Sequence, residues 1–248
     1  MSFKIKFHNY YENNINNTKN SITVGISTDY PPFSFTHNGK FIGFDIDFAY
    51  NLGKILNKHI IFKDIDFSSL IPSLYSKKVD IVISSISKNY ERIKNIDYSA
   101  PYYTSTLALI TNKYTKIQTI NDLQNIKIGV QTGTTMENFM VQYNKSIKKQ
   151  IDLVSLNSNF LLLAKLKIGE IDGIVIENAQ AVNFINNLLN CKAYLLENNF
   201  LVHEDNTCYV IGLRKKSQLV VKINRAIKNL NKNGKTQYLL NKWNISHR

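Results

Sequence analysis

Three serines and an arginine follow a short β-branched segment of this chain. Residues 79–83 are followed at once by Ser84, Ser85 and Ser87, and Arg92 comes five residues later. In an open parallel sheet, ligands bind beyond the carboxyl ends of the strands. Hydroxyl groups and a guanidinium at that edge could hold a carboxylate, because arginine offers two parallel charge-assisted N–H donors. The plainer interpretation is that the serines cap the next helix and that Arg92 is a surface charge.

Two further motifs could complete a binding site. Gly133-Thr134-Thr135 lies between a predicted strand and a predicted helix, where exposed N–H groups and threonine hydroxyls attract anions. The same tripeptide is also a common turn and cap. Asp172 lies in the next predicted strand, 171–176, and Glu177 comes directly after it. A carboxylate at the carboxyl end of that strand could bind an ammonium group, and it could equally be an exposed loop charge.

Two aromatic residues, Tyr30 and Phe67, each lie just past a predicted strand. Their rings could enclose a flat or aliphatic group, although aromatic residues belong more often to the core. Carboxylate donors, an acid for an amine and an aromatic slot together describe a site for an α-amino acid.

The elements that must position these residues follow a β-α-β-α-β order in the first part of the chain. β-branched runs predict the strands, and apolar residues at helical spacing predict the helices. This order predicts a parallel sheet with right-handed crossovers. The predicted elements are strand 22–26, helix 45–57, strand 60–62, helix 69–75 and strand 79–83.

The pattern then restarts, which predicts a second, similar lobe. No segment rich in Pro, Gly or Ser separates the two lobes, so we expect extended crossing strands to join them. The predicted strands here are 107–111, 127–130, 171–176, 194–196 and 209–213, and the predicted helices are 160–168, 179–189, 219–230 and 236–243.

Composition narrows the class of protein. The 248 residues are 44% hydrophobic and 20% charged, as in an ordinary globular chain. The apolar stretches, such as residues 160–164, are far shorter than the roughly 18 residues of a membrane helix. The net charge of +13 comes mostly from scattered lysines, which indicates a solvated basic surface. We expect no nucleic-acid partner, because the aromatic residues fall at strand ends rather than among basic residues.

Cysteine and histidine usage predicts no metal site and no cofactor. Cys191 and Cys208 match no zinc or CxxC spacing, and the five histidines are scattered. The two cysteines are either unpaired small apolar residues or one disulfide formed outside the cytosol. Residues 1–20 are polar and rich in asparagine, and no export signal is visible in them.

A set of short motifs runs through the chain in a fixed order. They are Tyr30-Pro31-Pro32-Phe33-Ser34-Phe35, Gly43-Phe44-Asp45-Ile46-Asp47, Leu70-Ile71-Pro72-Ser73-Leu74, Val79-Asp80-Ile81, Glu91-Arg92, Asp97-Tyr98-Ser99 and Pro101-Tyr102-Tyr103. Their order and spacing resemble the bacterial amino-acid solute-binding proteins of ABC importers (family 3, polar amino-acid group). Relatives in that group bind lysine, arginine, ornithine, histidine, glutamine or cystine. The resemblance covers nearly everything after residue 20.

The resemblance implies an α/β two-lobed periplasmic-binding-protein fold of type II. Each lobe is then a mostly parallel sheet flanked by helices, and two crossing strands join the lobes. The implied protein is a periplasmic or otherwise extracytoplasmic monomer. It captures a free polar L-amino acid and delivers it to an ABC importer permease. The implied division of the chain is an N-terminal extension (1–20), a first lobe (21–108), a second lobe (109–203) and a return to the first lobe (204–248).

The resemblance also implies binding roles, carried over position by position. An aromatic pair flanks the ligand side chain, hydroxyls and a guanidinium bind the α-carboxylate, and one acid binds the α-ammonium group. The aromatic pair is Tyr30 and Phe67, the carboxylate group is Ser84, Ser85, Ser87 and Arg92 with Thr134 and Thr135, and the acid is Glu177.

Two positions depart from the family pattern. Glu177 stands where the family usually has Asp, so its carboxylate reaches farther by one methylene. Ser27 stands where binders of basic side chains often carry Asp, and the nearest acid is Asp29. The identity of the amino acid is therefore left open.

Two other functions stay open. A cyclohexadienyl-dehydratase-like enzyme shares this fold and needs a general acid in the cleft, for which Glu177 or His203 is a candidate. A stand-alone amino-acid sensor shares the clamp but not the transporter. Binding without catalysis is the expectation, since no metal spacing and no Ser–His–Asp order is present.

Overall fold

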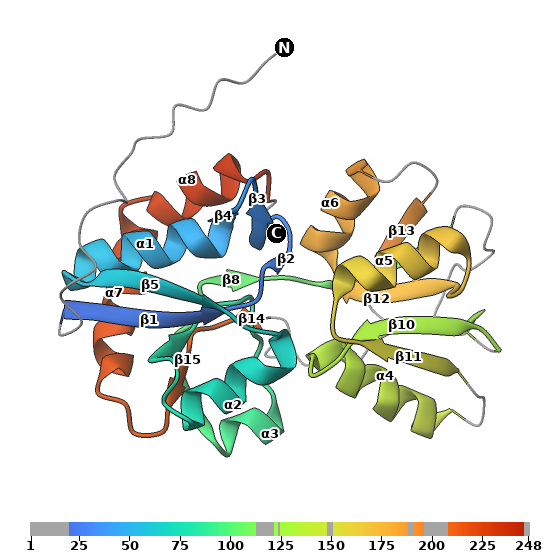
Figure 1. The fold of residues 1–248 in the computed structure, drawn as a ribbon, viewed down its shortest axis with the longest axis horizontal. Helices are drawn as coiled ribbons and strands as arrows, with labels where there is room; N and C mark the ends of the chain where they lie inside the picture. Colours follow the sequence, from blue (N-terminus) through green and yellow to red (C-terminus); the bar gives the residue numbers. More distant parts are fainter. Residues whose placement is uncertain are drawn as a thin grey trace, which may run out of the picture.

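The computed structural model describes residues 20–112, 122–123, 125–147, 151–187, 191–195 and 208–245. Figure 1 shows these residues as two bodies side by side, each built on its own sheet with helices packed against it. We call the body built around strand Ser21–Ile26 the first lobe and the body built around strand Lys127–Gln131 the second lobe. The predicted two-lobed α/β fold is confirmed.

The first-lobe sheet has a parallel centre and an antiparallel edge. β1 (Ser21–Ile26) pairs in parallel with β5 (His59–Asp64) and with β6 (Ile81–Val82). β15 (Gly212–Arg214) runs antiparallel to β6 and to β7 (Ile96–Tyr98). The sheet is mixed because the chain returns to it from its C-terminal part.

Helices cover this sheet where their apolar residues face it. The first-lobe helices are α1 (Phe44–Leu56), α2 (Leu70–Tyr75), α3 (Tyr90–Ile93), α7 (Leu219–Lys232) and α8 (Lys235–Lys242). In α1 the fully buried Phe44, Phe48 and Leu52 recur every four residues, which places them on one face. The helix ends at Asn57, whose left-handed backbone (φ 51°) stops it. A small antiparallel sheet adds β2 (Asp29–Tyr30), β3 (Ser34–His37) and β4 (Lys40–Ile42).

The second lobe repeats this plan. β10 (Lys127–Gln131) pairs in parallel with β11 (Asp152–Leu156) and β12 (Gly173–Glu177). β9 (Leu107–Asn112) runs antiparallel to β12 and to β13 (Cys191–Leu195). α4 lies on one face of this sheet and α5 on the other (Figure 1), since their buried residues belong to separate apolar clusters. The second-lobe helices are α4 (Thr135–Ser146), α5 (Asn159–Ile168) and α6 (Asn178–Asn187).

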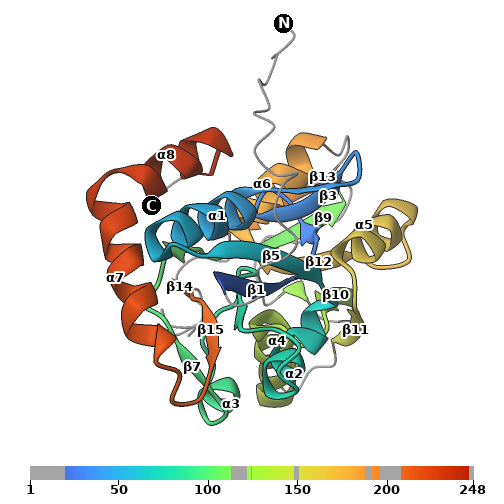
Figure 2. The ribbon, with the colours of Figure 1, turned by 60° about the vertical axis from the view of Figure 1, so that its left-hand side comes forward.

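Two short strands connect the lobes. β8 (Tyr103–Thr104) pairs antiparallel with β14 (Cys208–Tyr209), and the chain continues from β8 into β9 of the second lobe. Figure 2 shows α7 and α8 on the side of the first lobe that faces away from the second lobe. The two C-terminal helices therefore do not lie between the lobes.

A cluster of aromatic rings lies where the first lobe meets the crossing pair. The Phe33 ring centroid lies 5.1 Å from that of Tyr209, 5.4 Å from that of Tyr103 and 5.9 Å from that of Phe44. All four residues are buried. The Tyr30 ring packs on the same cluster, 5.8 Å from Phe33. Residues of the first lobe and of both crossing strands thus meet in one packed layer.

Some strands differ from the sequence-based expectation. Residues 209–213 form two strands rather than one, because β14 joins the crossing pair and β15 joins the first-lobe sheet. Only β6 is a strand within the predicted segment 79–83. The predicted division after residue 108 falls inside β9, and the division of the chain itself stays a prediction. Residues 1–19 and His203 lie outside the described residues.

The disulfide alternative stays a prediction. Cys208 Sγ lies 3.6 Å from Thr104 Oγ1 in the crossing pair. The side chain of Cys191 lies outside the described side chains.

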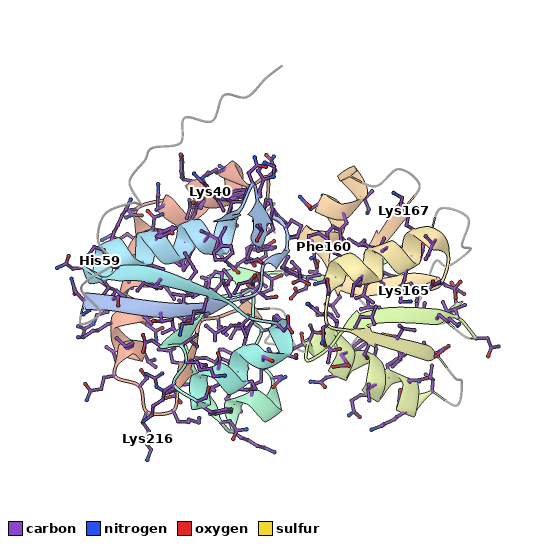
Figure 3. The ribbon with its side chains drawn as sticks, viewed as in Figure 1. Lys40, His59, Phe160, Lys165, Lys167 and Lys216 are labelled. Carbon is purple, nitrogen blue, oxygen red and sulfur yellow. The ribbon has the colours of Figure 1, made fainter. Side chains whose placement is uncertain are left out.

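The charged surface is spread over both lobes. Figure 3 places Lys40 and Lys216 on different sides of the first lobe, and Lys165 and Lys167 on α5 of the second. Within the described ranges, no helix is long and apolar enough to cross a membrane.

Candidate functional site

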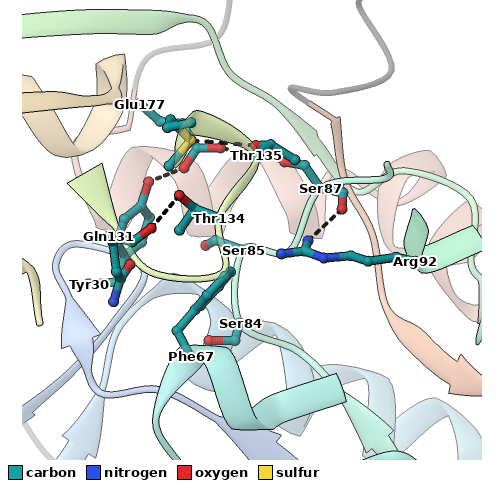
Figure 4. Close-up of a pocket in the computed structure, with 11 residues that line it drawn as sticks. Tyr30, Phe67, Ser84, Ser85, Ser87, Arg92, Gln131, Thr134, Thr135 and Glu177 are labelled. Atoms are coloured by element: carbon teal, nitrogen blue, oxygen red, sulfur yellow. Dashed lines mark hydrogen bonds between the residues drawn. The ribbon is translucent and has the colours of Figure 1, made fainter. Parts of the chain in front are cut away.

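One cavity lies between the two lobes, and all nine residues predicted for the site line it (Figure 4). The first lobe contributes the aromatic pair, the serines and the arginine, and the second lobe contributes the two threonines and the acid. Two further residues of the second lobe complete the lining. The eleven lining residues are Tyr30, Phe67, Ser84, Ser85, Ser87, Arg92, Gln131, Thr134, Thr135, Met136 and Glu177.

The serines sit where β6 ends at the edge of the first-lobe sheet. Ser84 Oγ accepts a hydrogen bond from the backbone N–H of Ser27 at 3.0 Å, so its own proton can be donated elsewhere. Ser85 Oγ donates to Asp45 at 3.0 Å. Ser85 also has a left-handed backbone (φ 48°), which is uncommon for a residue with a side chain and is found often at functional sites. The predicted convergence of hydroxyls is present, and the Ser85 proton is already used within the first lobe.

Hydrogen bonds within the protein fix the position of Arg92 without a ligand. Asn89 caps the short helix α3 by accepting from the Arg92 backbone N–H at 2.6 Å. The guanidinium donates from Nη1 to the Ser87 carbonyl at 2.8 Å and from Nη2 to the Gly133 carbonyl of the second lobe. It also lies 5.6 Å from the centre of the Phe67 ring. Burial lowers the pKa of Arg92 from its usual value.

The two threonines sit at the start of α4, which begins at the cleft. Thr134 caps the helix, because its Oγ1 accepts from the Glu137 N–H at 3.1 Å and donates to the Gln131 carbonyl at 2.7 Å. The Glu137 carboxylate in turn accepts from the N–H of Gly133, the residue before the cap, at 2.7 Å. The positive end of the α4 dipole therefore faces the cavity, where an anion is favoured.

Glu177 is the last residue of β12, and its carboxylate is buried in the cavity wall. It accepts hydrogen bonds from the Tyr30 hydroxyl and, at 3.5 Å, from Ser87 Oγ, both in the first lobe. Burial raises the pKa of Glu177 to about 7, against the opposing effect of hydrogen bonds from Tyr30, Tyr209 and Ser87 and of the Arg92 charge. A cation brought to this carboxylate would favour its ionised form.

Asp172 does not take part, and the hypothesis that it binds an ammonium group is wrong. Its carboxylate accepts from the Lys127 N–H at 2.7 Å, at the start of β12. Five residues of extended strand, about 16 Å, separate it from Glu177. Asp172 therefore fixes the register of two second-lobe strands.

Two lining residues, Gln131 and Met136, were missed by the sequence reasoning. Gln131 is the last residue of β10, so its place at the carboxyl end of a parallel strand could have identified it. Met136 follows the two threonines on α4 and is an ordinary buried apolar residue, which gives no such signal.

Nothing in the described ranges gathers three or more His, Cys, Asp or Glu side chains that could hold a metal ion. The lining instead combines a cationic group of the first lobe and an acidic group of the second lobe with aromatic and hydroxyl groups. These groups match the two charges of a small zwitterion.

Comparison with known proteins gives a family match and several similar chains. The model of the bacterial extracellular solute-binding proteins, family 3, matches residues 22–246. The arginine-binding extracellular protein ArtP of Bacillus subtilis is 30% identical over 91% of this chain and 86% of its own length. The L-cystine-binding protein TcyJ of Escherichia coli is also 30% identical, over 91% of this chain and 83% of its own. A solved structure of an ancestral arginine-binding protein bound to arginine is 32% identical, with a TM-score of 0.83 over 90% of this chain and 98% of its own.

Proposed function

The chain belongs to the bacterial extracellular solute-binding proteins of family 3, and we propose that it captures a free polar L-amino acid between its two lobes and delivers it to the permease of an ABC importer. It acts outside the cytoplasm, as a monomer, and changes its ligand in no covalent way. The relatives named above are binding proteins for arginine and cystine. That kinship supports an amino acid as the ligand and leaves its side chain open.

One observation carries the proposal. A cation from the first lobe, Arg92, and an acid from the second lobe, Glu177, line the same cavity. An amino-acid zwitterion presents a carboxylate to the guanidinium and an ammonium group to the acid. The hydroxyls of Ser84 and Thr135 and the start of α4 add donors around the carboxylate.

The ligand side chain has a wall of its own in this proposal. Tyr30, Phe67 and Met136 offer apolar and aromatic surface, and Gln131 offers an amide. Glutamate or aspartate would bring a second carboxylate next to Glu177, and no further cation lies among the lining residues. Acidic amino acids are therefore expected to bind much more weakly than neutral or basic ones.

The two lobes work as a clamp. Neither lobe alone offers partners for both charges of the ligand, so a zwitterion binds the closed arrangement better than the open one. Binding then shifts the equilibrium towards closure. The crossing pair β8 and β14 is the natural hinge, with the lobes dividing between Thr104 and Leu107. The permease would recognise the closed shape.

The test is isothermal titration calorimetry of the ligand-stripped protein against the twenty amino acids, ornithine and cystine. Saturable binding of one or a few L-amino acids supports the proposal, and recovery of the ligand unchanged by NMR separates binding from catalysis. Arg92→Lys is the matched control for Arg92→Ala, because it keeps the charge but loses the two-pronged geometry. If folded wild-type protein binds none of these ligands, the proposal is wrong.

A further inference from the structure

An acidic residue outside the cavity lining makes a second set of contacts between the lobes. Asp29 belongs to β2 of the first lobe. Its Oδ2 accepts from the backbone N–H of Asn159 at 2.9 Å and from Gln131 Nε2 at 3.3 Å, and both donors belong to the second lobe. Its Oδ1 accepts from Ser27 Oγ at 3.0 Å within the first lobe. The carboxylate thus bridges the cleft at a place distinct from Arg92 and Glu177.

The contact completes a helix of the other lobe. Ser158 stands at the N-cap position of α5, yet its side chain makes no capping hydrogen bond to the helix. Asp29 takes that place instead, by accepting from Asn159, the first residue of the ten-residue helix. A carboxylate at a helix N-terminus satisfies a backbone donor and interacts favourably with the helix dipole. The first lobe therefore supplies the cap of a second-lobe helix.

The same contact reaches the wall of the cavity. Gln131 Nε2 donates to the Asn157 carbonyl at 3.1 Å as well as to Asp29. Gln131 Oε1 accepts from Asn159 Nδ2 at 2.8 Å. Gln131 and Asn159 are buried, so these amide groups are fixed by one another and by Asp29. When Asp29 is in place, Gln131 has one defined orientation towards the ligand site.

We propose that Asp29, Gln131 and Asn159 form an interlobe clasp, in which Asp29 holds the lobes together and positions Gln131 as a wall of the ligand site. The two cross-cleft bonds exist only while the lobes are together, because Asn159 and Gln131 move with the second lobe. Opening exchanges both bonds for water and leaves α5 without its cap. The clasp stabilises the closed arrangement and slows ligand release. Its effect on ligands rests on the proposed function, and its effect on closure does not.

Asp29→Ala tests the clasp, and Asp64→Ala is the matched control. Asp64 is a neighbouring acid whose carboxylate accepts from the Thr28 N–H at 3.2 Å and from Thr28 Oγ1 at 2.8 Å, entirely within the first lobe. Removing the charge-assisted bonds of Asp29 should raise the dissociation constant about tenfold or more, mostly through faster dissociation. Small-angle X-ray scattering of the ligand-stripped variant should give a larger radius of gyration. Asp64→Ala should change neither quantity.

Asp29→Asn keeps the size of the side chain and guards against a variant that fails to fold. It should lie between wild type and Asp29→Ala in dissociation rate, since an amide oxygen can still accept from Asn159 but carries no charge. The clasp is refuted if folded Asp29→Ala and Asp29→Asn keep the wild-type dissociation rate and radius of gyration, or if Asp64→Ala changes them equally. If the wild-type protein binds no amino acid, the proposed function fails, while the scattering comparison still decides the clasp.

Discussion

The two halves of the cleft are built differently. In the first lobe, Arg92 is held by Asn89 and by the Ser87 carbonyl, and Ser84 is fixed by the Ser27 backbone. In the second lobe, Glu177 has Tyr30 and Ser87 of the first lobe as partners. Most of the proposed carboxylate donors thus have partners within the first lobe, although Arg92 also donates to the Gly133 carbonyl of the second lobe. The proposed acid for the ammonium group has its hydrogen-bond partners across the cleft.

This difference indicates an order of events. A ligand can bind first through its carboxylate to the first lobe, where the donors are in place and little rearrangement is needed. Closure then brings Glu177 to the ammonium group and Thr135 to the carboxylate. We therefore expect the first-lobe donors to the carboxylate to control whether a ligand binds at all, and the contacts made on closure to control how long it stays.

Among the variants, Arg92→Ala should raise the dissociation constant most. Truncating one partner of a buried charge pair costs about 2–5 kcal/mol of binding free energy, so the dissociation constant should rise by about thirtyfold or much more. Titration calorimetry with the tightest wild-type ligand measures this. A loss smaller than that caused by Glu177→Gln would place the dominant contact in the second lobe and overturn the comparison.

Glu177→Gln should have the next largest effect. Glutamine keeps the size and an acceptor oxygen but loses the charge that pairs with the ammonium group. The loss of a charged hydrogen bond, about 1.5–3 kcal/mol, should raise the dissociation constant about tenfold to a hundredfold. Stopped-flow fluorescence should show the change mainly in the dissociation rate. An equal change in the association rate would contradict the proposed order of events.

Lowering the pH should weaken ligand binding by protonating Glu177 of the second lobe. Burial raises the pKa of Glu177 to about 7. The ammonium group needs the ionised carboxylate, so affinity should fall as the pH drops below about 7, by about tenfold between pH 8 and pH 6. Calorimetry in buffers of different ionisation enthalpy should also detect proton release on binding near pH 7.

The variant Glu177→Gln is the control for this pH dependence, and the same raised pKa also affects the stability of the fold. Glu177→Gln should bind with nearly constant affinity over the same range, and an unchanged wild-type slope in this variant would assign the effect to another group. In the ligand-stripped protein, the raised pKa of Glu177 contributes to the free energy of unfolding. This contribution is fully present at a pH below 4.5, the ordinary pKa of the group. That contribution is lost as the pH rises through about 7.

Thr134→Ala should have the smallest effect on ligand affinity, and its main effect should be on the free energy of unfolding. Thr134 caps α4 by accepting from the Glu137 N–H at 3.1 Å. Losing a threonine cap costs about 1 kcal/mol of the free energy of unfolding. Urea denaturation should detect this, while Ser146→Ala, at the exposed end of α4, should leave stability nearly unchanged. A dissociation constant raised more than about tenfold would mean that Thr134 binds the ligand directly.

Sequence patterns predicted the local elements well, because each follows from a short-range period. The spacing of Ile46, Ala49 and Leu52 identified α1, and the β-branched run in 22–26 identified β1. The prediction of residues 209–213 as one strand failed because period-two patterning does not show that β14 and β15 belong to different sheets.

What the sequence determined by itself was the set of chemical groups at the ends of strands. Ser84 and Glu177 could be identified because a residue's place at the carboxyl end of a parallel strand is fixed by the strand itself. Arg92 was grouped with the serines by its nearness in the sequence, and it lies on α3. Asp172, which the sequence left open between an ammonium partner and a loop charge, precedes β12 and lies at the opposite end of the strand from Glu177.

Only the tertiary structure decided which groups meet across the cleft. Asp29 and Asn159 are 130 residues apart, and Tyr30 and Glu177 are 147 residues apart. No periodicity links such pairs, because their distance depends on the path of the crossing strands β8 and β14 and on how far the lobes close. The chemistry of each half of the site is therefore local, and the contacts that join the halves are set by the geometry of the whole fold.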